Sequence, residues 1–259
     1  MKKLPIGIQT LKDFKENNYV YVDKTEHIHN LVSKGKVYFL SRPRRFGKSL
    51  LINTLKELFK GNKELFEGLY IYDKWDWSKK NPVIHLDLAE INYKSGKELE
   101  LSLNIFLDDT AKSNGVSVTE SVLISVKFRQ LIEQLHKVTG ERIVILIDEY
   151  DKPMIDSLNK GKGIHQEIKE SLHDFYQVIK AGDEHIQFVL LTGVSQFSGL
   201  SIFSGLNNLN NITMNSKYGS ICGYTQEELE RDFKEHIEYT AKELKMTRRW
   251  TVIRDKEVV

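Results

Sequence analysis

The chain has few of the residues that form covalent cross-links or membrane anchors. Cys222 is the single cysteine among 259 residues, so an intrachain disulfide and a four-cysteine zinc site are both excluded. Long apolar runs are also missing, since a run such as residues 143–147 is far too short to cross a bilayer. Residues 1–7 lack the apolar core of a signal peptide. We therefore expect a cytoplasmic protein with no membrane partner.

Neither sign of charge is in large excess. The net charge of +2 is too small to indicate a nucleic-acid or membrane partner by itself. The charge is unevenly spread, because residues 1–80 carry 17 Lys/Arg against 9 Asp/Glu, a net of +8 that leaves −6 for the rest. A basic N-terminal third fits a site for polyanionic phosphate and fits nucleic acid equally well. A solvated basic face is the ordinary alternative.

Short apolar runs alternate with segments of helical periodicity along the chain. Strands are predicted at residues 19–22, 37–40, 82–88, 142–147 and 187–192. Helices are predicted at residues 25–34, 48–59, 99–110, 120–138, 165–179 and 226–244. Thr25 is the expected N-cap of the first of these helices, and Thr225 caps the last with Glu228 at the capping-box position. This alternation predicts an α/β fold, with a mainly parallel sheet flanked by helices on both faces in three layers.

In such a sheet, ligands bind beyond the carboxyl ends of the strands. The segments that follow Leu40, Leu88, Ile147 and Leu191 are therefore expected to converge on one site. Residues 198–216 are rich in Gly, Ser and Asn, and we expect them to form a long, mobile loop near that site.

A phosphate-binding loop is predicted between the strand at residues 37–40 and the helix that follows. Gly47, Lys48 and Ser49 open that helix, where backbone N–H groups can cradle phosphate. Lys48 is expected to reach the β- and γ-phosphates of a nucleotide, and Ser49 to offer its hydroxyl to Mg²⁺. One position departs from the usual pattern, because Arg42 stands five residues before Gly47 where Gly normally supplies unusual backbone angles.

The departure adds positive charge to the loop. Pro43 favours an extended Arg42, and the guanidinium groups of Arg42, Arg44 and Arg45 can each bind phosphate oxygens bidentately. The nucleotide-binding residues are predicted to be the run Arg42, Pro43, Arg44, Arg45, Phe46, Gly47, Lys48, Ser49 and Leu50. For this segment alone, a basic loop before an ordinary amphipathic helix is the alternative.

A second motif, Asp148-Glu149, ends the most apolar predicted strand. One carboxylate at a strand end can hold the Mg²⁺ shell while the next faces the γ-phosphate. Asp148 is therefore predicted to bind the metal together with Ser49, and Glu149 to orient and polarise the attacking water. Asp151 is one turn away and is placed to support them.

Two further polar residues lie in predicted strands. Thr192 ends the strand at residues 187–192 and is a candidate catalytic residue that senses the γ-phosphate or water; capping the strand is the equal alternative. Asp87 interrupts an otherwise apolar run, and a buried carboxylate there needs a partner. It either faces the catalytic water or hydrogen-bonds to a loop.

Several strings of the chain resemble the AAA-ATPase-like family of bacterial and archaeal P-loop proteins. They lie at residues 21–25, 41–50, 147–153, 191–195 and 203–209, and the resemblance covers about residues 4–245. It implies that Arg42 is the family's own variant of the loop. It also implies a P-loop core with an additional strand and a Walker B motif at Asp148 and Glu149. Asp23 and Lys24 are implied either to hold the N-terminal arm against the site or to touch the nucleotide.

Members of this family usually continue through a helical region into a PD-(D/E)XK nuclease-like domain. Residues 223–229 resemble the start of the helical region, whereas residues from about 247 onward do not resemble the expected continuation. We therefore expect an ATPase domain with an N-terminal arm over residues 1–222 and a partial helical extension over 223–259. On this interpretation the chain is truncated and has no nuclease activity.

Together the motifs predict an ATP-binding protein whose Mg²⁺-dependent hydrolysis drives or gates a partner or a lost nuclease-like domain. The chain has no Asn/Thr-Lys-x-Asp string for reading guanine, which favours ATP over GTP. No arginine finger is identifiable in the sequence; Arg44 or Arg45 in cis, and a neighbouring subunit of a homo-oligomer in trans, are the candidate sources. Two alternatives stay open: a nucleotide-gated switch without significant turnover, and a nucleic-acid-acting protein, for which no DNA-binding motif is present.

Overall fold

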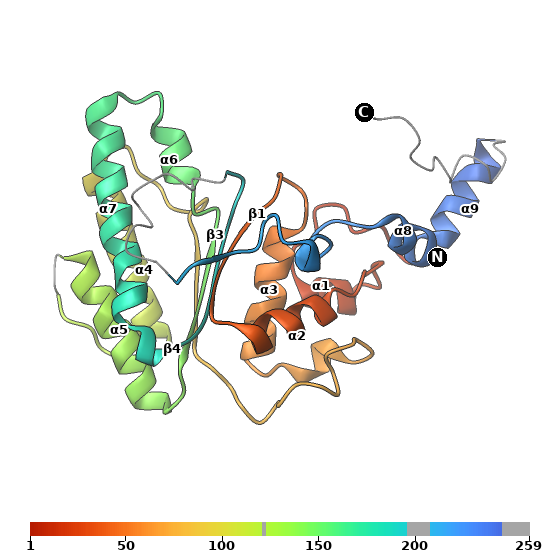
Figure 1. Cartoon of the computed structure of the whole chain (residues 1–259), viewed down its shortest axis with the longest axis horizontal. Coiled ribbons are helices and arrows are strands. Elements are labelled where there is room, and N and C mark those ends of the chain that lie inside the picture. Colours follow the sequence, from red (N-terminus) through yellow and green to blue (C-terminus); the bar gives the residue numbers. More distant parts are fainter. Residues whose placement is uncertain (121–122, 196–207, 245–259) are drawn as a thin grey trace.

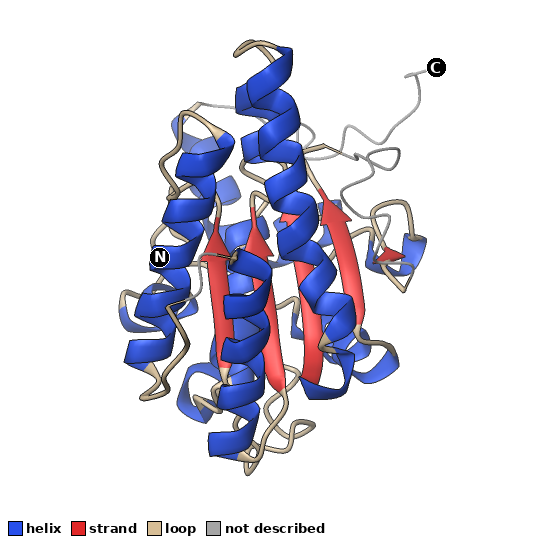
Figure 2. Ribbon diagram, turned by 90° about the vertical axis from the view of Figure 1, so that its left-hand side faces the viewer, coloured by secondary structure: helices blue, strands red, loops and turns tan. Residues whose placement is uncertain are grey.

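A parallel β-sheet forms the centre of the protein (Figures 1 and 2). The computed structural model describes residues 1–120, 123–195 and 208–244. Within these ranges the sheet has five strands in the order β2-β3-β4-β1-β5, and every neighbouring pair is parallel. The strands are β1 (Val37–Ser41), β2 (Val83–Asp87), β3 (Ile143–Asp148), β4 (Ile186–Gly193) and β5 (Asn210–Asn211).

Strand β4 lies between the strand that precedes the phosphate loop and the strand that ends in Asp148. It pairs with β1 from Val37↔Val189 to Ser41↔Gly193, and with β3 up to Ile147↔Leu191. This order confirms the additional strand that the family resemblance implies. It also brings the carboxyl ends of β1, β3 and β4 to one edge of the sheet, where a parallel sheet binds its ligands.

Helices cover both faces of the sheet, so the fold is the predicted three-layer α/β/α arrangement (Figure 1). Alternate strand residues point to opposite faces: Phe39 packs with the layer of α4, α5 and α7, whereas Tyr38 and Leu40 pack with α1, α2 and α3. The helices are α1 (Leu11–Glu16), α2 (Thr25–Lys34), α3 (Lys48–Phe59), α4 (Gly96–Ser113), α5 (Ile124–Thr139), α6 (Lys152–Ser157), α7 (Lys162–Ala181), α8 (Gln226–Asp232) and α9 (Lys234–Glu243).

The predicted strand at residues 19–22 is wrong. Val20 and Val22 are buried in a strand-like alternation, but the segment joins no sheet and makes only an isolated bridge between Tyr19 and Lys3. The N-cap prediction for Thr25 is also wrong, since Thr25 is the first residue of α2. Its backbone N–H donates to the carboxylate of Asp23 at 2.8 Å, so the capping oxygen comes from two residues earlier.

The C-terminal part of the described chain differs from the prediction in two places. The single helix predicted at residues 226–244 is divided at Phe233 into α8 and α9, although the capping box of Thr225 and Glu228 is confirmed. Residues 198–207 of the predicted loop, and the tail from 247, lie outside the described residues. The described part of that loop includes β5, which extends the sheet beside β1. Within the described ranges, no helix is both long enough and apolar enough to span a bilayer.

Candidate functional site

The loop between β1 and α3 turns sharply through two residues with left-handed backbone angles. Gly47 has a φ of +88° and Arg45 a φ of +68°. A Cβ added at Gly47 would meet no atom within 4 Å, so this position favours glycine for its backbone angle and not for lack of space. The left-handed conformation costs a residue with a side chain about 1–2 kcal/mol, which the rest of the structure must offset at Arg45.

Lys48 is the first residue of α3, directly after the loop, and its side chain is almost fully buried. Its ammonium donates to the carbonyl oxygen of Pro43 at 3.3 Å and lies 3.7 Å from Oε1 of Glu149. A buried ammonium needs such partners because desolvation penalises an isolated charge. The ion pair joins the phosphate loop to the end of β3.

Ser49, Asp148 and Thr192 meet at the edge of the sheet, from three separate elements. The Ser49 hydroxyl donates to Oδ2 of Asp148 at 2.7 Å, and the Thr192 hydroxyl donates to Oδ1 at 2.5 Å. Asp148 is 1% exposed and Thr192 is fully buried. A hydroxyl beside a carboxylate supplies hard oxygen ligands of the kind that Mg²⁺ prefers, so the side chains of Ser49 and Asp148 fit that cation.

Glu149 follows Asp148 and adopts an unusual backbone conformation. Its φ is +51°, an angle that is rare outside glycine and often found at functional sites. Its backbone N–H donates to Oδ1 of Asp148 at 3.0 Å. Burial raises the pKa of the Glu149 carboxyl, the Lys48 ammonium opposes that rise, and the Asp148 charge adds to it. A carboxylate with a raised pKa is a stronger base, which suits a group that polarises water.

The carboxylates of Asp87 and Asp151 have different surroundings. Asp87 is the partner of Asp148 in the β2–β3 register, lines the same cavity as Glu149 and accepts from the backbone N–H of Ala89 at 2.8 Å. Burial raises the pKa of its carboxyl. Asp151 is fully buried, and its Oδ2 accepts from the backbone N–H groups of Val194 and Ser195 at 3.0 and 2.6 Å. Asp151 therefore holds the segment that follows Thr192.

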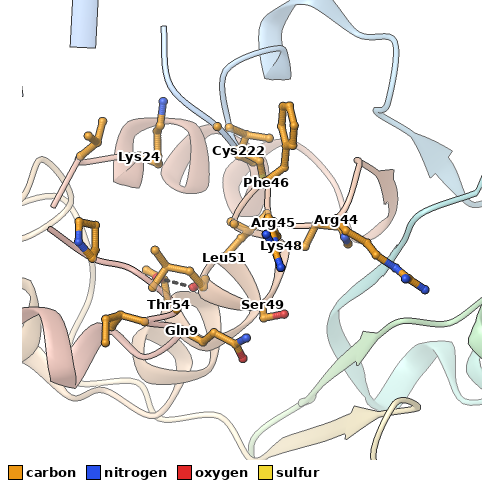
Figure 3. A pocket seen from close by; sticks show the side chains of 18 of the residues that line it. Gln9, Lys24, Arg44, Arg45, Phe46, Lys48, Ser49, Leu51, Thr54 and Cys222 are labelled. Carbon is orange, nitrogen blue, oxygen red and sulfur yellow. Dashed lines mark hydrogen bonds between the residues drawn. The ribbon is translucent and has the colours of Figure 1, made fainter. Parts of the chain in front are cut away.

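The three arginines of the loop do not share one role. The Arg42 guanidinium donates to the carbonyl oxygens of Ser41, Thr213 and Tyr218 at 2.8–3.1 Å. Arg44 and Arg45 are exposed and line the cavity beside Lys48. Of the predicted nucleotide-binding run, residues 44–50 line this cavity, whereas Arg42 and Pro43 do not. Figure 3 labels Arg44, Arg45, Phe46, Lys48 and Ser49 among the lining residues.

A cavity of about 1030 Å³ extends from the phosphate loop. Beyond Lys48 and Ser49 it is lined by residues 5–9 of the N-terminal arm, by residues around the start of α2 such as Lys24, and by residues 221–224 and Leu229. Large ligand pockets of this kind are mostly apolar with a few convergent polar groups. The family resemblance implied that Asp23 and Lys24 hold the arm against the site, but neither residues 5–9 nor residues 221–229 were among the predicted site residues. No local motif marks them, and only tertiary packing brings them to the loop.

The sheet order, the Gly47-Lys48-Ser49 loop and the Asp148-Glu149 strand end define a P-loop protein of the ATPase type. Residues 5–203 match the family described as Predicted AAA-ATPase, and the chain belongs to that family.

A curated relative is the "Uncharacterized protein in vnfD 5'region" of Azotobacter chroococcum mcd 1. It is 45% identical over 233 residues, which cover 90% of this chain and 45% of that protein. The chain thus spans less than half the length of this relative. Among solved structures, the Aeropyrum pernix ORC1 protein in complex with DNA aligns with 89% of this chain and 54% of its own, at 11% identity and a TM-score of 0.43.

Proposed function

We propose that the chain binds ATP together with Mg²⁺ and hydrolyses the terminal phosphoanhydride bond. The observation that carries the proposal is the hydrogen-bonded group of Ser49, Asp148 and Thr192, next to the Lys48–Glu149 ion pair. Phosphoryl transfer requires mainly positioning and neutralisation of charge. These five side chains supply an ammonium, a hydroxyl–carboxylate pair for a cation, a basic carboxylate and a buried hydroxyl at one edge of the sheet.

Lys48 and the backbone N–H groups at the start of α3 are assigned to the β- and γ-phosphates. Because the Lys48 ammonium lies 3.7 Å from Glu149, an arriving triphosphate competes with that carboxylate for the lysine. Ser49 and Asp148 would hold Mg²⁺, which when bound neutralises phosphate charge. Arg44 and Arg45 are exposed at the cavity and add positive charge to its phosphate end.

Glu149 is assigned to the attacking water. Once a phosphate draws Lys48 away, Glu149 loses its ion-pair partner, and burial keeps the pKa of its carboxyl raised. It can then accept a hydrogen bond from water and take up the proton. Thr192 fixes the carboxylate of Asp148 through the 2.5 Å hydrogen bond and so supports the neighbouring Ser49 and Glu149.

We further propose that turnover drives or gates a partner, either another protein, a second copy of this chain or a further part of a longer protein.

The test measures ATP binding and Mg²⁺-dependent turnover in the wild type, Lys48→Ala and Glu149→Gln. Lys48→Ala is expected to lose binding, whereas Glu149→Gln is expected to bind ATP and to lose turnover. The matched controls are Lys97→Ala and Glu64→Gln, because both side chains are exposed and neither lines the cavity. Turnover by Glu149→Gln at the wild-type rate contradicts the role of Glu149. If the wild type binds ATP tightly without turnover, the ATPase proposal is wrong and the chain is a nucleotide-gated switch.

A further inference from the structure

Arg42, which stands where phosphate loops usually have glycine, is bound to a distant part of the chain. Its guanidinium donates to the carbonyl oxygens of Thr213 and Tyr218 at 2.8 and 3.1 Å, across 171 and 176 residues of sequence. It donates also to the carbonyl oxygen of Ser41 at 2.9 Å. A guanidinium has a fixed fork of donors. The three carbonyls engage three of its five donors, and Arg42 does not line the cavity beside Lys48.

Phe46, in the same loop, contacts the next part of that segment. Its carbonyl oxygen accepts from the backbone N–H of Gly223 at 2.9 Å. A Cβ added at Gly223 would lie 3.2 Å from the Phe46 ring, so ring and backbone are in close contact. The phosphate loop thus holds residues 213–223 at three points: Thr213, Tyr218 and Gly223.

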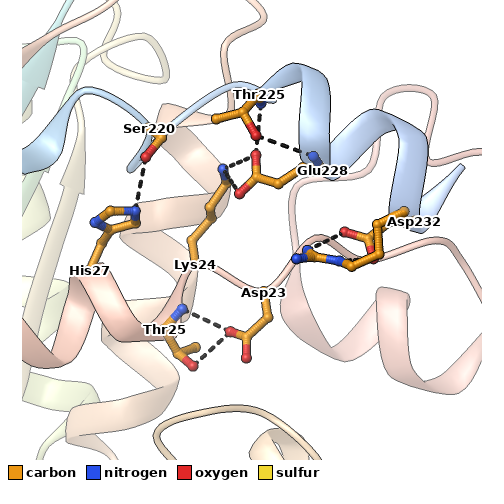
Figure 4. A network of polar contacts seen from close by, with 9 residues as sticks. Asp23, Lys24, Thr25, His27, Ser220, Thr225, Glu228 and Asp232 are labelled. Carbon is orange, nitrogen blue, oxygen red and sulfur yellow. Dashed lines mark hydrogen bonds and ion pairs between the residues drawn. The ribbon is translucent and has the colours of Figure 1, made fainter.

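A partly buried ion pair fixes the start of α8 against the other side of the cavity. The Lys24 ammonium lies 2.6 and 2.5 Å from the two carboxylate oxygens of Glu228, and the side chains are only 12% and 14% exposed (Figure 4). Glu228 also accepts from the backbone N–H of Thr225 at 2.8 Å. Nearby, the Ser220 hydroxyl lies 3.0 Å from Nε2 of His27 on α2. Residues 220–228 are therefore anchored on both the loop and α2.

These anchored residues and Leu229 of α8 form one wall of the cavity, which we call the far wall: Ile221, Cys222, Gly223, Tyr224 and Leu229. The far wall is mainly apolar, whereas the end of the cavity at Lys48 and Ser49 is polar. An apolar wall suits the flat face of a base, and the polar end suits the phosphates. A nucleotide whose phosphates lie at Lys48 and Ser49 can therefore place its nucleoside against the far wall.

We propose that Arg42 and Phe46 are positioning residues that hold the far wall against the nucleoside, and that Arg42 is not a phosphate ligand. The inference rests on the proposed function, because it requires a nucleotide in the cavity. The loop then has two separate tasks. Lys48 and Ser49 face the phosphates, while Arg42 and Phe46 fix the distance between the loop and residues 213–223.

Inorganic tripolyphosphate separates the two tasks, because it carries the phosphate chain of ATP without the nucleoside. In the variant Arg42→Lys the positive charge is retained, but one ammonium cannot replace a fork that spans the carbonyls of Thr213 and Tyr218. We expect ATP to bind about tenfold more weakly, the equivalent of one net hydrogen bond. Tripolyphosphate binding is expected to stay unchanged. Both affinities are measured by calorimetry on the full chain with Mg²⁺ present.

The variant Glu228→Gln tests the other anchor of the far wall. An amide oxygen can still accept from the N–H of Thr225, so the capping box is kept while the charge opposite Lys24 is lost. Glu227→Gln is the matched control, since its side chain is exposed and has no partner among the described residues. Glu228→Gln is expected to weaken ATP binding, leave tripolyphosphate unaffected and increase amide hydrogen exchange over residues 224–232. Glu227→Gln is expected to change none of these.

The outcomes are distinct. If Arg42→Lys weakens ATP and tripolyphosphate by the same factor, Arg42 is a phosphate ligand and the inference is wrong. Unchanged ATP affinity in both Arg42→Lys and Glu228→Gln also overturns it. Thermal unfolding without nucleotide checks that each variant is folded; if Arg42→Lys is not, Glu228→Gln decides. A wild type that binds neither ligand contradicts the proposed function instead.

Discussion

The hydrogen bond between Thr192 and Asp148 gives a prediction that can be tested without nucleotide. Thr192→Val keeps the shape of the side chain and removes the hydroxyl that donates to Oδ1 of Asp148 at 2.5 Å. Both residues are at least 99% buried, so water cannot replace the lost donor. Oδ1 keeps one donor, the backbone N–H of Glu149 at 3.0 Å.

The expected cost follows from that geometry. Removing one partner of a buried acceptor costs about 1–3 kcal/mol of the free energy of unfolding. A loss of about 2 kcal/mol corresponds to a thermal unfolding midpoint that is lower by roughly 4–8 °C in a chain of this size. Thr192→Ser is the paired variant, because it keeps the hydroxyl and loses one methyl group, at about 1 kcal/mol.

Urea unfolding of the nucleotide-free protein measures the stability, and Mg²⁺-dependent ATP turnover measures the consequence for the site. Turnover is expected to follow the hydroxyl, with Thr192→Ser near the wild type and Thr192→Val well below it. A Thr192→Val protein that unfolds within about 0.5 kcal/mol of the wild type shows that the bond carries little energy. Equal turnover in the two variants shows that the hydroxyl does not position the catalytic groups.

Three other predictions concern Lys48 and Glu149. Lys48→Met should abolish ATP binding while leaving the fold intact, which calorimetry and circular dichroism check together; ATP affinity at the wild-type level excludes the phosphate role. Glu149→Gln should slow turnover by about 10²–10⁴-fold, with ATP affinity retained in an equilibrium binding assay, so a parallel loss of affinity would point to a binding role instead. The pKa of Glu149 is raised in the folded protein, so the ionised carboxylate destabilises the fold increasingly as pH rises through its ordinary value. Wild type should therefore lose stability relative to Glu149→Gln as the pH rises above about 4. Urea unfolding at increasing pH that shows the opposite slope contradicts the raised pKa.

The elements that depend on short-range pattern agree well with the sequence prediction. The apolar runs of β1, β3 and β4 are strands, since burial on both faces requires a mostly apolar sequence. The capping box at Thr225 forms as predicted, because its donors and acceptors are within three residues of each other. Residues 19–22 have the apolar alternation of a strand and yet pair with no sheet, because that alternation reports burial and does not supply a hydrogen-bonding neighbour.

Short-range chemistry thus determined the site's reactive groups: the loop amides with Lys48 and Ser49, and the carboxylates of Asp148 and Glu149. Each of these two groups lies in a short motif at the carboxyl end of a predicted strand, so it can be recognised from the local sequence. Only the tertiary structure decided that Arg42 reaches Thr213 and Tyr218, and that Lys24 meets Glu228 across 204 residues. The same holds for the N-terminal arm and the far wall, which enclose the cavity. The physical reason is that a side chain's type sets which bonds it can make, whereas the packing of distant segments sets which partner is within reach.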